Sequence, residues 1–245
     1  MRSFAMTYPQ LMNQAVAVGF ADADLLRLRD AHELARGLVD GLYRKYSTPF
    51  LCHLIRTASI TMSETRSTDV VLAALLHAVY ILNTFDGSSR RGPRRSDRDL
   101  LRARIGPAAE ELITLYSETP WHRPEVLEAH AQNAASHPPR TRGLLLMVLA
   151  NELEDHLDAA EAYAGSVGEG MPDDRHAAAC FVLAEGLGHH ALASDLREAF
   201  ELSRNASVAP ILRTGREGSY EAKRLWRANP LERLGEALRR YRTSR

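Results

Sequence analysis

Apolar residues recur at helical spacing along the chain, and one stretch is apolar on every side. Residues Asp69 to Leu82 read Asp-Val-Val-Leu-Ala-Ala-Leu-Leu-His-Ala-Val-Tyr-Ile-Leu. A helix without a polar face belongs at the centre of a bundle, because other helices must cover it on all sides. Ser67 and Thr68 precede it as N-cap candidates. We therefore predict a central helix over this stretch, with one imidazole, His77, enclosed by its neighbours.

Amphipathic segments separated by Gly, Pro and polar turns make up most of the remaining sequence, whereas alternating strand patterns are almost absent. This pattern predicts an all-α protein: a helical bundle over residues 1–165, then a Gly-rich linker and a C-terminal helical extension, residues 166–245, packed on it. The spacing predicts further helices over Tyr8–Val18, Asp22–Tyr43, Pro49–Ser63, Asp97–Arg104, Ala108–Ser117, Glu125–Ala134, Arg142–Ala164, Asp174–Leu187, His190–Leu202 and Leu225–Tyr241.

A long polar segment, Asn83–Asp97, follows the central helix. Structureless segments of this length inside a compact domain are often functional or disordered. Because the segment leaves the helix that carries His77, its side chains can reach the mouth of a pocket around that histidine. A guanidinium fork matches a phosphate group, so we predict a mobile lid over an anionic ligand, with a solvated linker as the alternative. Its four arginines are Arg90, Arg91, Arg94 and Arg95.

Composition narrows the classes of function. The 245 residues include 31 basic and 31 acidic side chains, so the formal net charge is zero and no global attraction to nucleic acid or to an anionic membrane is indicated. Cys52 and Cys180 are too few for a disulfide framework. The chain has no 18-residue apolar run, and its first residues lack the apolar core of a signal peptide. We expect a cytoplasmic protein with a small-molecule partner, and the sequence leaves a homodimer open.

Three polar positions fall on three of the predicted apolar helices. His53 lies on the helix that begins at Pro49, His77 lies on the central helix, and Asn151 begins a polar run on a late helix. Over roughly residues 25 to 165 this order resembles the HD superfamily of helical metal-dependent phosphohydrolases, most of all the HD half of the stringent-response nucleotide hydrolases. The stretches that carry the resemblance are Pro49–Leu54, Val70–Ala78, Arg104–Leu112 and Val148–Leu153.

The resemblance implies a divalent metal site with two departures. In that family a His, a His-Asp pair and a late Asp hold the metal, which activates a water molecule for attack on phosphorus. His53 and His77 match the two histidines, but Ala78 replaces the Asp of the pair and Asn151 stands at the late Asp. Two negative ligands are therefore missing. We expect a degenerate pocket in which a divalent metal is a doubtful cofactor.

Other side chains could complete such a site. Glu152 and His156 are four residues apart and can share a helix face, so a metal set of His53, His77, Glu152 and His156 is one prediction. The alternative is that residues 151–158 form the solvated face of an amphipathic helix.

Substrate-binding candidates lie near the two histidines. Arg56, one turn after His53, could bind a carboxylate or phosphate, or could form a surface ion pair. Tyr80, one turn after His77, could donate a proton or stack on a ligand, or could pack in the core. Asn151 and the lid arginines Arg90 and Arg91 complete the predicted substrate-binding set.

These patterns favour a small-molecule enzyme that acts on an anionic substrate, for example a phosphorylated one. His53 and His77 would be its catalytic residues, either as acid and base or as residual metal ligands. The alternative is a non-catalytic ligand-binding or regulatory module with the same pocket. An HD-type metal oxygenase would need more histidines and carboxylates in register. The motifs of a Ser triad, a phosphate-binding Gly loop and a zinc Cys cluster are absent from the sequence.

Overall fold

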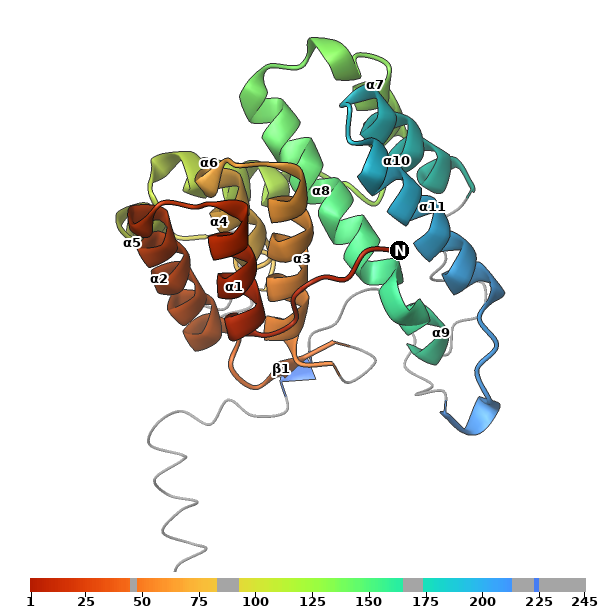
Figure 1. Ribbon diagram of the computed structural model, residues 1–245, viewed down its shortest axis with the longest axis horizontal. Helices are drawn as coiled ribbons and strands as arrows, with labels where there is room; N and C mark the ends of the chain where they lie inside the picture. Colours follow the sequence, from red (N-terminus) through yellow and green to blue (C-terminus); the bar gives the residue numbers. More distant parts are fainter. Residues whose placement is uncertain (45–47, 83–92, 165–173, 213–222, 225–245) are drawn as a thin grey trace, which may run out of the picture.

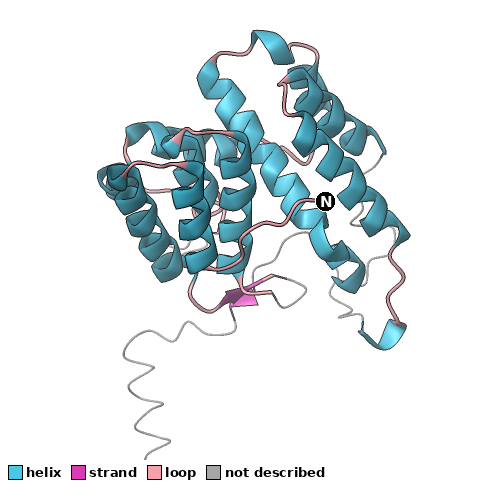
Figure 2. Ribbon diagram, in the orientation of Figure 1, coloured by secondary structure: helices cyan, strands magenta, loops and turns pink. Residues whose placement is uncertain are grey.

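A computed structural model describes residues 1–44, 48–82, 93–164, 174–212 and 223–224 of the chain. The regular secondary structure of the described part is helical apart from one two-residue strand pair, which confirms the predicted all-α class (Figure 2). The α-helices are α1 (Tyr8–Val18), α2 (Asp22–Val39), α3 (Phe50–Glu64), α4 (Thr68–Leu76), α5 (Arg95–Ile105), α6 (Pro107–Glu118), α7 (Pro124–Ala131), α8 (Pro139–His156), α9 (Ala160–Ala164), α10 (Asp174–Gly186) and α11 (His190–Asn205). The short elements are β1 (Leu42–Tyr43), β2 (Lys223–Arg224) and the 3-10 turns η1 (Ala134–Ser136), η2 (Leu157–Ala159) and η3 (Pro210–Leu212).

Two groups of helices lie on either side of the long helix α8 (Figure 1). Helices α3, α4 and α6 contact it from the N-terminal group, α1 to α6, while α10 and α11 contact it from the other side. Helix α7 packs on α10, so residues before the predicted boundary at 165 join the C-terminal hairpin. The turn η1 that follows α7 also lies close to α10, since a Cβ added at Gly186 would lie 2.6 Å from the Cβ of Ala134. Helix α8 is therefore a wall shared by both groups.

Helix α4 is the central helix that the sequence predicted, but it is shorter. Its residues Val70 to Leu76 are all buried, and α2, α3, α6 and α8 surround it. The prediction that the helix continues to Leu82 is wrong, because residues 77–82 form turns after Leu76. The ring Nδ1 of His77 lies 2.7 Å from the carbonyl oxygen of Ala74, so the side chain takes an acceptor that a longer helix would use for its backbone.

Two other predicted helices end early for identifiable reasons. Helix α2 stops at Val39 rather than Tyr43, and Gly41, with φ of 72°, turns the chain into β1. Helix α8 stops at His156, because Asp158 has a φ of 62° that an α-helix does not accept. The predicted helix Arg142–Ala164 is therefore α8, a break, and the short helix α9.

A two-strand pair joins the segment before α3 to a late part of the chain. Strands β1 and β2 pair antiparallel, Leu42 with Arg224 and Tyr43 with Lys223, so residues far apart in sequence meet beside the start of α3. The predicted helix Leu225–Tyr241 lies outside the described residues, and so do Arg90 and Arg91 of the predicted lid. Among the described helices, none has the length and hydropathy needed to cross a bilayer.

Candidate functional site

A cavity of about 510 Å³ lies where α3, the end of α4, α6 and α8 meet. Part of its wall is apolar and aromatic, with Phe50, Tyr116 and Trp121 among the lining residues. The indole N–H of Trp121 donates to the carbonyl oxygen of Tyr116 at 2.9 Å, which fixes this part of the wall. The polar lining residues include Arg44, His53, His77, Asn151 and Glu152.

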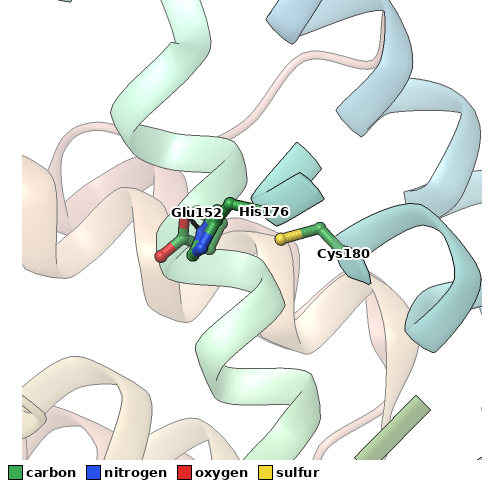
Figure 3. Close-up of side chains that lie close together, drawn as sticks. All are labelled: Glu152, His176 and Cys180. Carbon is green, nitrogen blue, oxygen red and sulfur yellow. Dashed lines mark hydrogen bonds and ion pairs between the residues drawn. The ribbon is translucent and has the colours of Figure 1, made fainter. Parts of the chain in front are cut away.

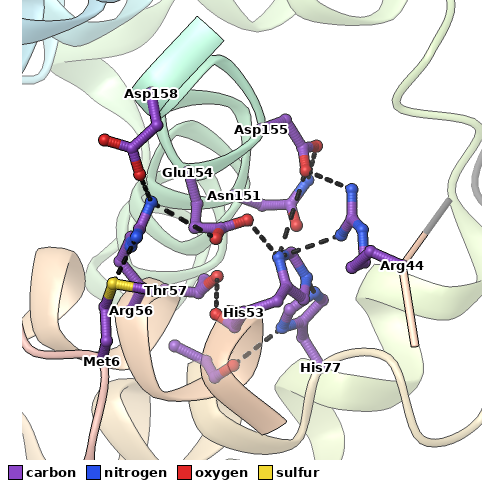
Figure 4. A network of polar contacts seen from close by, with 11 residues as sticks. Met6, Arg44, His53, Arg56, Thr57, His77, Asn151, Glu154, Asp155 and Asp158 are labelled. Carbon is purple, nitrogen blue, oxygen red and sulfur yellow. Dashed lines mark hydrogen bonds and ion pairs between the residues drawn. The ribbon is translucent and has the colours of Figure 1, made fainter. Parts of the chain in front are cut away.

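The structure brings the two predicted catalytic histidines together. The Nε2 atoms of His53 on α3 and His77 at the end of α4 are 3.3 Å apart, and the rings meet edge to face (Figure 4). Only 1% of His53 and 2% of His77 is exposed. Phe50 packs on His53 and Tyr116 packs on His77, with ring centroids 5.1 Å and 5.0 Å apart. The aromatic rings hold both imidazoles in place.

Contacts behind each ring fix where its hydrogen lies. A carbonyl oxygen only accepts hydrogen bonds, so Nδ1 of His77 must carry the hydrogen that it donates to Ala74. Nδ1 of His53 contacts the carboxylate of Glu154 and lies 3.0 Å from Nη1 of Arg44. One ring nitrogen cannot serve both, and because the carboxylate is closer we place the hydrogen on Nδ1. Both Nε2 lone pairs then converge on one point.

Burial keeps these bases in their neutral form. Burial in the bundle, with the neighbouring His53 as the second cause, lowers the pKa of His77 to about 3. Burial also lowers the pKa of His53, against the opposing attraction of Glu154. Near pH 7 the two rings are therefore neutral, with lone pairs free to accept a proton.

The carboxylates that support His53 come from the face of α8 that begins with Asn151. Asp155 accepts a hydrogen bond of 2.6 Å from Nη2 of Arg44 and one of 3.1 Å from Nδ2 of Asn151 (Figure 4). Arg56 donates to Asp158 at 2.8 Å and lies 4.0 Å from Glu154. Both arginines are buried, so each negative charge behind His53 has a fixed positive partner.

The predicted metal set of His53, His77, Glu152 and His156 is brought together only in part, because the first three line the cavity and His156 does not. Successive residues of an α-helix point about 100° apart, so the neighbours of Asn151 on the His53 side are residues 154 and 155. The His156 ring stacks on Phe200 of α11, with centroids 4.0 Å apart, and Glu152 binds His176 of α10 at 2.9 Å. The helical periodicity could have selected Glu154 and Asp155 instead, but Arg44, in the loop before α3, gave no sequence signal.

The donors around the two histidines match an HD-type metal centre only in part. Two nitrogens bound to one tetrahedral ion at about 2.0–2.1 Å lie about 3.3 Å apart, which the histidine pair matches. However, Ala78 offers only a methyl group, and Asn151 directs its amide N–H at Asp155. The guanidinium of Arg44 adds positive charge to the same wall. The donor set therefore does not fit that centre.

Tyr80 lies outside the cavity, contrary to its predicted role in substrate binding. Its hydroxyl donates to Oε1 of Glu110 at 3.1 Å. Glu110 is fully buried and also accepts hydrogen bonds from Arg98 and Arg102, at 2.8 Å and 2.9 Å. Burial, with the Glu110 charge second, raises the pKa of Tyr80. This cluster joins α5 and α6 to the turn after α4, and the sequence analysis did not identify Glu110.

Comparison with known proteins gives one family match. Residues 39–120 match a family described as Domain of unknown function (DUF6817), about a third of the chain. The matched range contains α3, α4 and both cavity histidines, but it ends before the carboxylates of α8. No curated protein matches the chain.

Proposed function

We propose that the chain is an enzyme in which His53 and His77 act as the acid–base pair on a small anionic substrate. The observation that supports this proposal is the convergence of the two Nε2 atoms, 3.3 Å apart, at the wall of a cavity. Both Nε2 atoms start as bases. Glu154 orients His53 through Nδ1 and stabilises the imidazolium that forms when Nε2 of His53 accepts a proton, and this imidazolium is the acid that returns the proton. A group positioned in this way contributes about 10²–10⁴-fold to rate.

The lining supports a substrate with an apolar body and one negative group. Phe50, Tyr116 and Trp121 offer aromatic surface, and Arg44 places a buried positive charge on the same wall. The volume of about 510 Å³ lies in the range of small-molecule sites. The same expectation of an anionic substrate follows from the sequence, because the positions of His53 and His77 resemble those of the HD superfamily.

The test is a ligand screen followed by a search for turnover. Nucleotides, sugar phosphates and aromatic carboxylates are added to the full-length protein, and those that raise Tm are incubated with it and followed by NMR. We expect His53→Gln and His77→Gln to retain the shift in Tm within a few degrees and to lose turnover by a factor of about 10² or more. Cys52→Ser, on α3 next to His53, is the matched control and should keep both.

A non-catalytic ligand-binding module is the second candidate, and one observation favours it. The charged side chains behind the histidines already form ion pairs, Arg44 with Asp155 and Arg56 with Asp158. A bound ligand therefore needs no proton transfer to balance them. Under this alternative the same ligands raise Tm, but no bond in them changes in the wild type. That result would contradict the enzyme proposal, whereas turnover that survives in both histidine variants would contradict the assignment of His53 and His77 as the acid–base pair.

A further inference from the structure

A second cluster of polar side chains lies on the other side of α8, facing α10. Glu152 comes from α8, while His176 and Cys180 lie four residues apart on one face of α10 (Figure 3). The Nε2 atom of His176 is 2.9 Å from Oε2 of Glu152, and the three potential ligand atoms lie within 4.8 Å of one another. His176 is 5% exposed and Cys180 is fully buried.

The partner of Glu152 differs from the partners of three buried carboxylates elsewhere in the fold, although the buried Glu154 also contacts an imidazole. Glu110, Asp155 and Asp195 each accept a hydrogen bond from an arginine. Among the described residues no Lys or Arg forms an ion pair with Glu152, whose partner is the imidazole of His176. The cluster thus combines a carboxylate, an imidazole and a thiol.

We propose that Glu152, His176 and Cys180 bind a divalent transition metal of the zinc class between α8 and α10. Sulfur, imidazole nitrogen and carboxylate oxygen are the three ligand types of protein zinc sites, whereas Mg²⁺ and Ca²⁺ prefer oxygen alone. Ligand atoms on a tetrahedral zinc ion lie about 3.3–3.8 Å apart, so separations within 4.8 Å close by small side-chain rotations.

Metal binding would also change the state of Cys180. Burial, with the Glu152 charge second, raises the pKa of its thiol, so without metal the sulfur remains protonated. A metal ion binds the thiolate, so the sulfur–hydrogen bond breaks, a sulfur–metal bond forms and the proton leaves to the buffer.

The position of Glu152 links the metal site to the rest of the molecule. Its carboxylate lines the cavity of the proposed active site, while its partners belong to α10. Three protein ligands leave the fourth position of a tetrahedral ion to water. The ion would join the two helix groups through α8, and this inference stands whether or not His53 and His77 catalyse a reaction.

Cobalt titration tests the site, because thiolate ligation gives Co²⁺ a charge-transfer absorption in the near ultraviolet. The full-length protein is stripped with a chelator, freed of the chelator and titrated with Co²⁺, and Zn²⁺ affinity is measured by competition with a chromophoric chelator. We expect the wild type to show the thiolate band at one equivalent, and Cys180→Ser to lose it. Glu152→Gln and His176→Gln should weaken Zn²⁺ binding by about 100-fold or more, because loss of even an outer partner costs 10–100-fold.

The chain supplies its own matched controls. Cys52→Ser removes the other cysteine of the sequence and should leave the band unchanged. His53→Gln should also leave it unchanged, which separates this site from the proposed active site. Zn²⁺ should raise Tm of the wild type and not of Cys180→Ser. Absence of the band in the wild type, or its survival in Cys180→Ser, would show that the cluster is only an ion pair beside a thiol.

Discussion

At the level of single residues, the atoms behind the two cavity histidines decide what they can do. His53 and His77 occupy neighbouring helices, yet the carboxylate of Glu154 and the carbonyl of Ala74 determine which ring nitrogen faces the cavity. The sequence predicted the two histidines from their order and spacing. It could not indicate the Ala74 contact, because a backbone carbonyl next to a helix end has no residue signature.

The acidity of His77 gives a prediction for stability. Its folded-state pKa is about 3, against an ordinary 6.5, so between these values only the unfolded state takes up the proton. The stabilising effect of neutral His77 is complete above about pH 6.5 and falls with decreasing pH, by up to about 1.4 kcal/mol per pH unit. The groups around it that contribute to the shift are His53, Arg44 and Glu154.

The slope of unfolding free energy against pH is therefore the quantity to measure. We expect urea unfolding of His77→Gln between pH 5 and pH 7 to show a smaller slope than the wild type. Leu75→Ala, a fully buried position two residues earlier, controls for lost stability, because it lowers the free energy at every pH without changing the slope. Equal slopes for His77→Gln and the wild type would contradict the prediction.

Restoring the two missing acids tests the proposed register of α4 and α8. Ala78 lines the cavity and Asn151 lies beside it, so Ala78→Asp combined with Asn151→Asp should create carboxylates next to both Nε2 atoms. We expect Mn²⁺ or Zn²⁺ affinity to rise by about tenfold or more, measured by calorimetry in a Cys180→Ser background. Asn151→Asp alone adds a charge beside Asp155 and should lower Tm.

At the level of secondary structure, helix positions followed from periodicity and helix ends did not. Helix α1 has the bounds that the sequence predicted, because a glycine with φ of 87° follows Val18. Helix α4 ends inside an apolar stretch and helix α8 inside a polar stretch, and either sequence is compatible with a longer helix. Their ends depend on His77 and on Asp158, which meets Arg56 from another helix. Local patterns do not contain that information.

Two helical glycines give opposite predictions for the same substitution. A Cβ at Gly143 of α8 would lie 2.7 Å from Cγ2 of Val70, whereas a Cβ at Gly37 of α2 meets nothing within 4 Å. Gly143→Ala should lower the free energy of unfolding by about 1–3 kcal/mol. Gly37→Ala should raise it by up to about 1 kcal/mol, since alanine favours the helix.

A double-mutant cycle identifies the cause. Val70→Ala makes room for the new methyl group, so Gly143→Ala should be much less destabilising in that background. Chemical denaturation of the four proteins gives the coupling energy. Additive effects would show that the close contact between α8 and α4 is not what excludes a side chain at Gly143.

At the level of the whole molecule, the sequence predicted the helices but not which helix packs against which. The sequence indicated an all-α chain with an early and a late part, but it assigned α7 to the early part. Leu127 of α7 is fully buried, and the helix packs on α10, which begins at Asp174. An apolar stripe shows that a helix needs a partner, but it does not identify the partner.

The pairing of β1 with β2 predicts a local effect of truncation. Ending the chain after Leu212 removes β2 and leaves Leu42 and Tyr43 without their strand partner. We expect amide hydrogen exchange of residues 42–43 to rise by about tenfold or more, and exchange of α3 and α4 to stay within twofold, as measured by mass spectrometry. Faster exchange throughout α4 would mean that the removed segment supports the core.

The packing of α7 on α10 has a consequence during translation. About 60 residues separate Leu127 from Gly186, so the ribosome needs roughly 3–12 s to deliver the covering helix at 5–20 residues per second. Throughout that interval the apolar side of α7 faces water or a chaperone, although α1 to α6 have already been synthesised. The apolar side of α7 is therefore open to aggregation between the synthesis of α7 and that of α10.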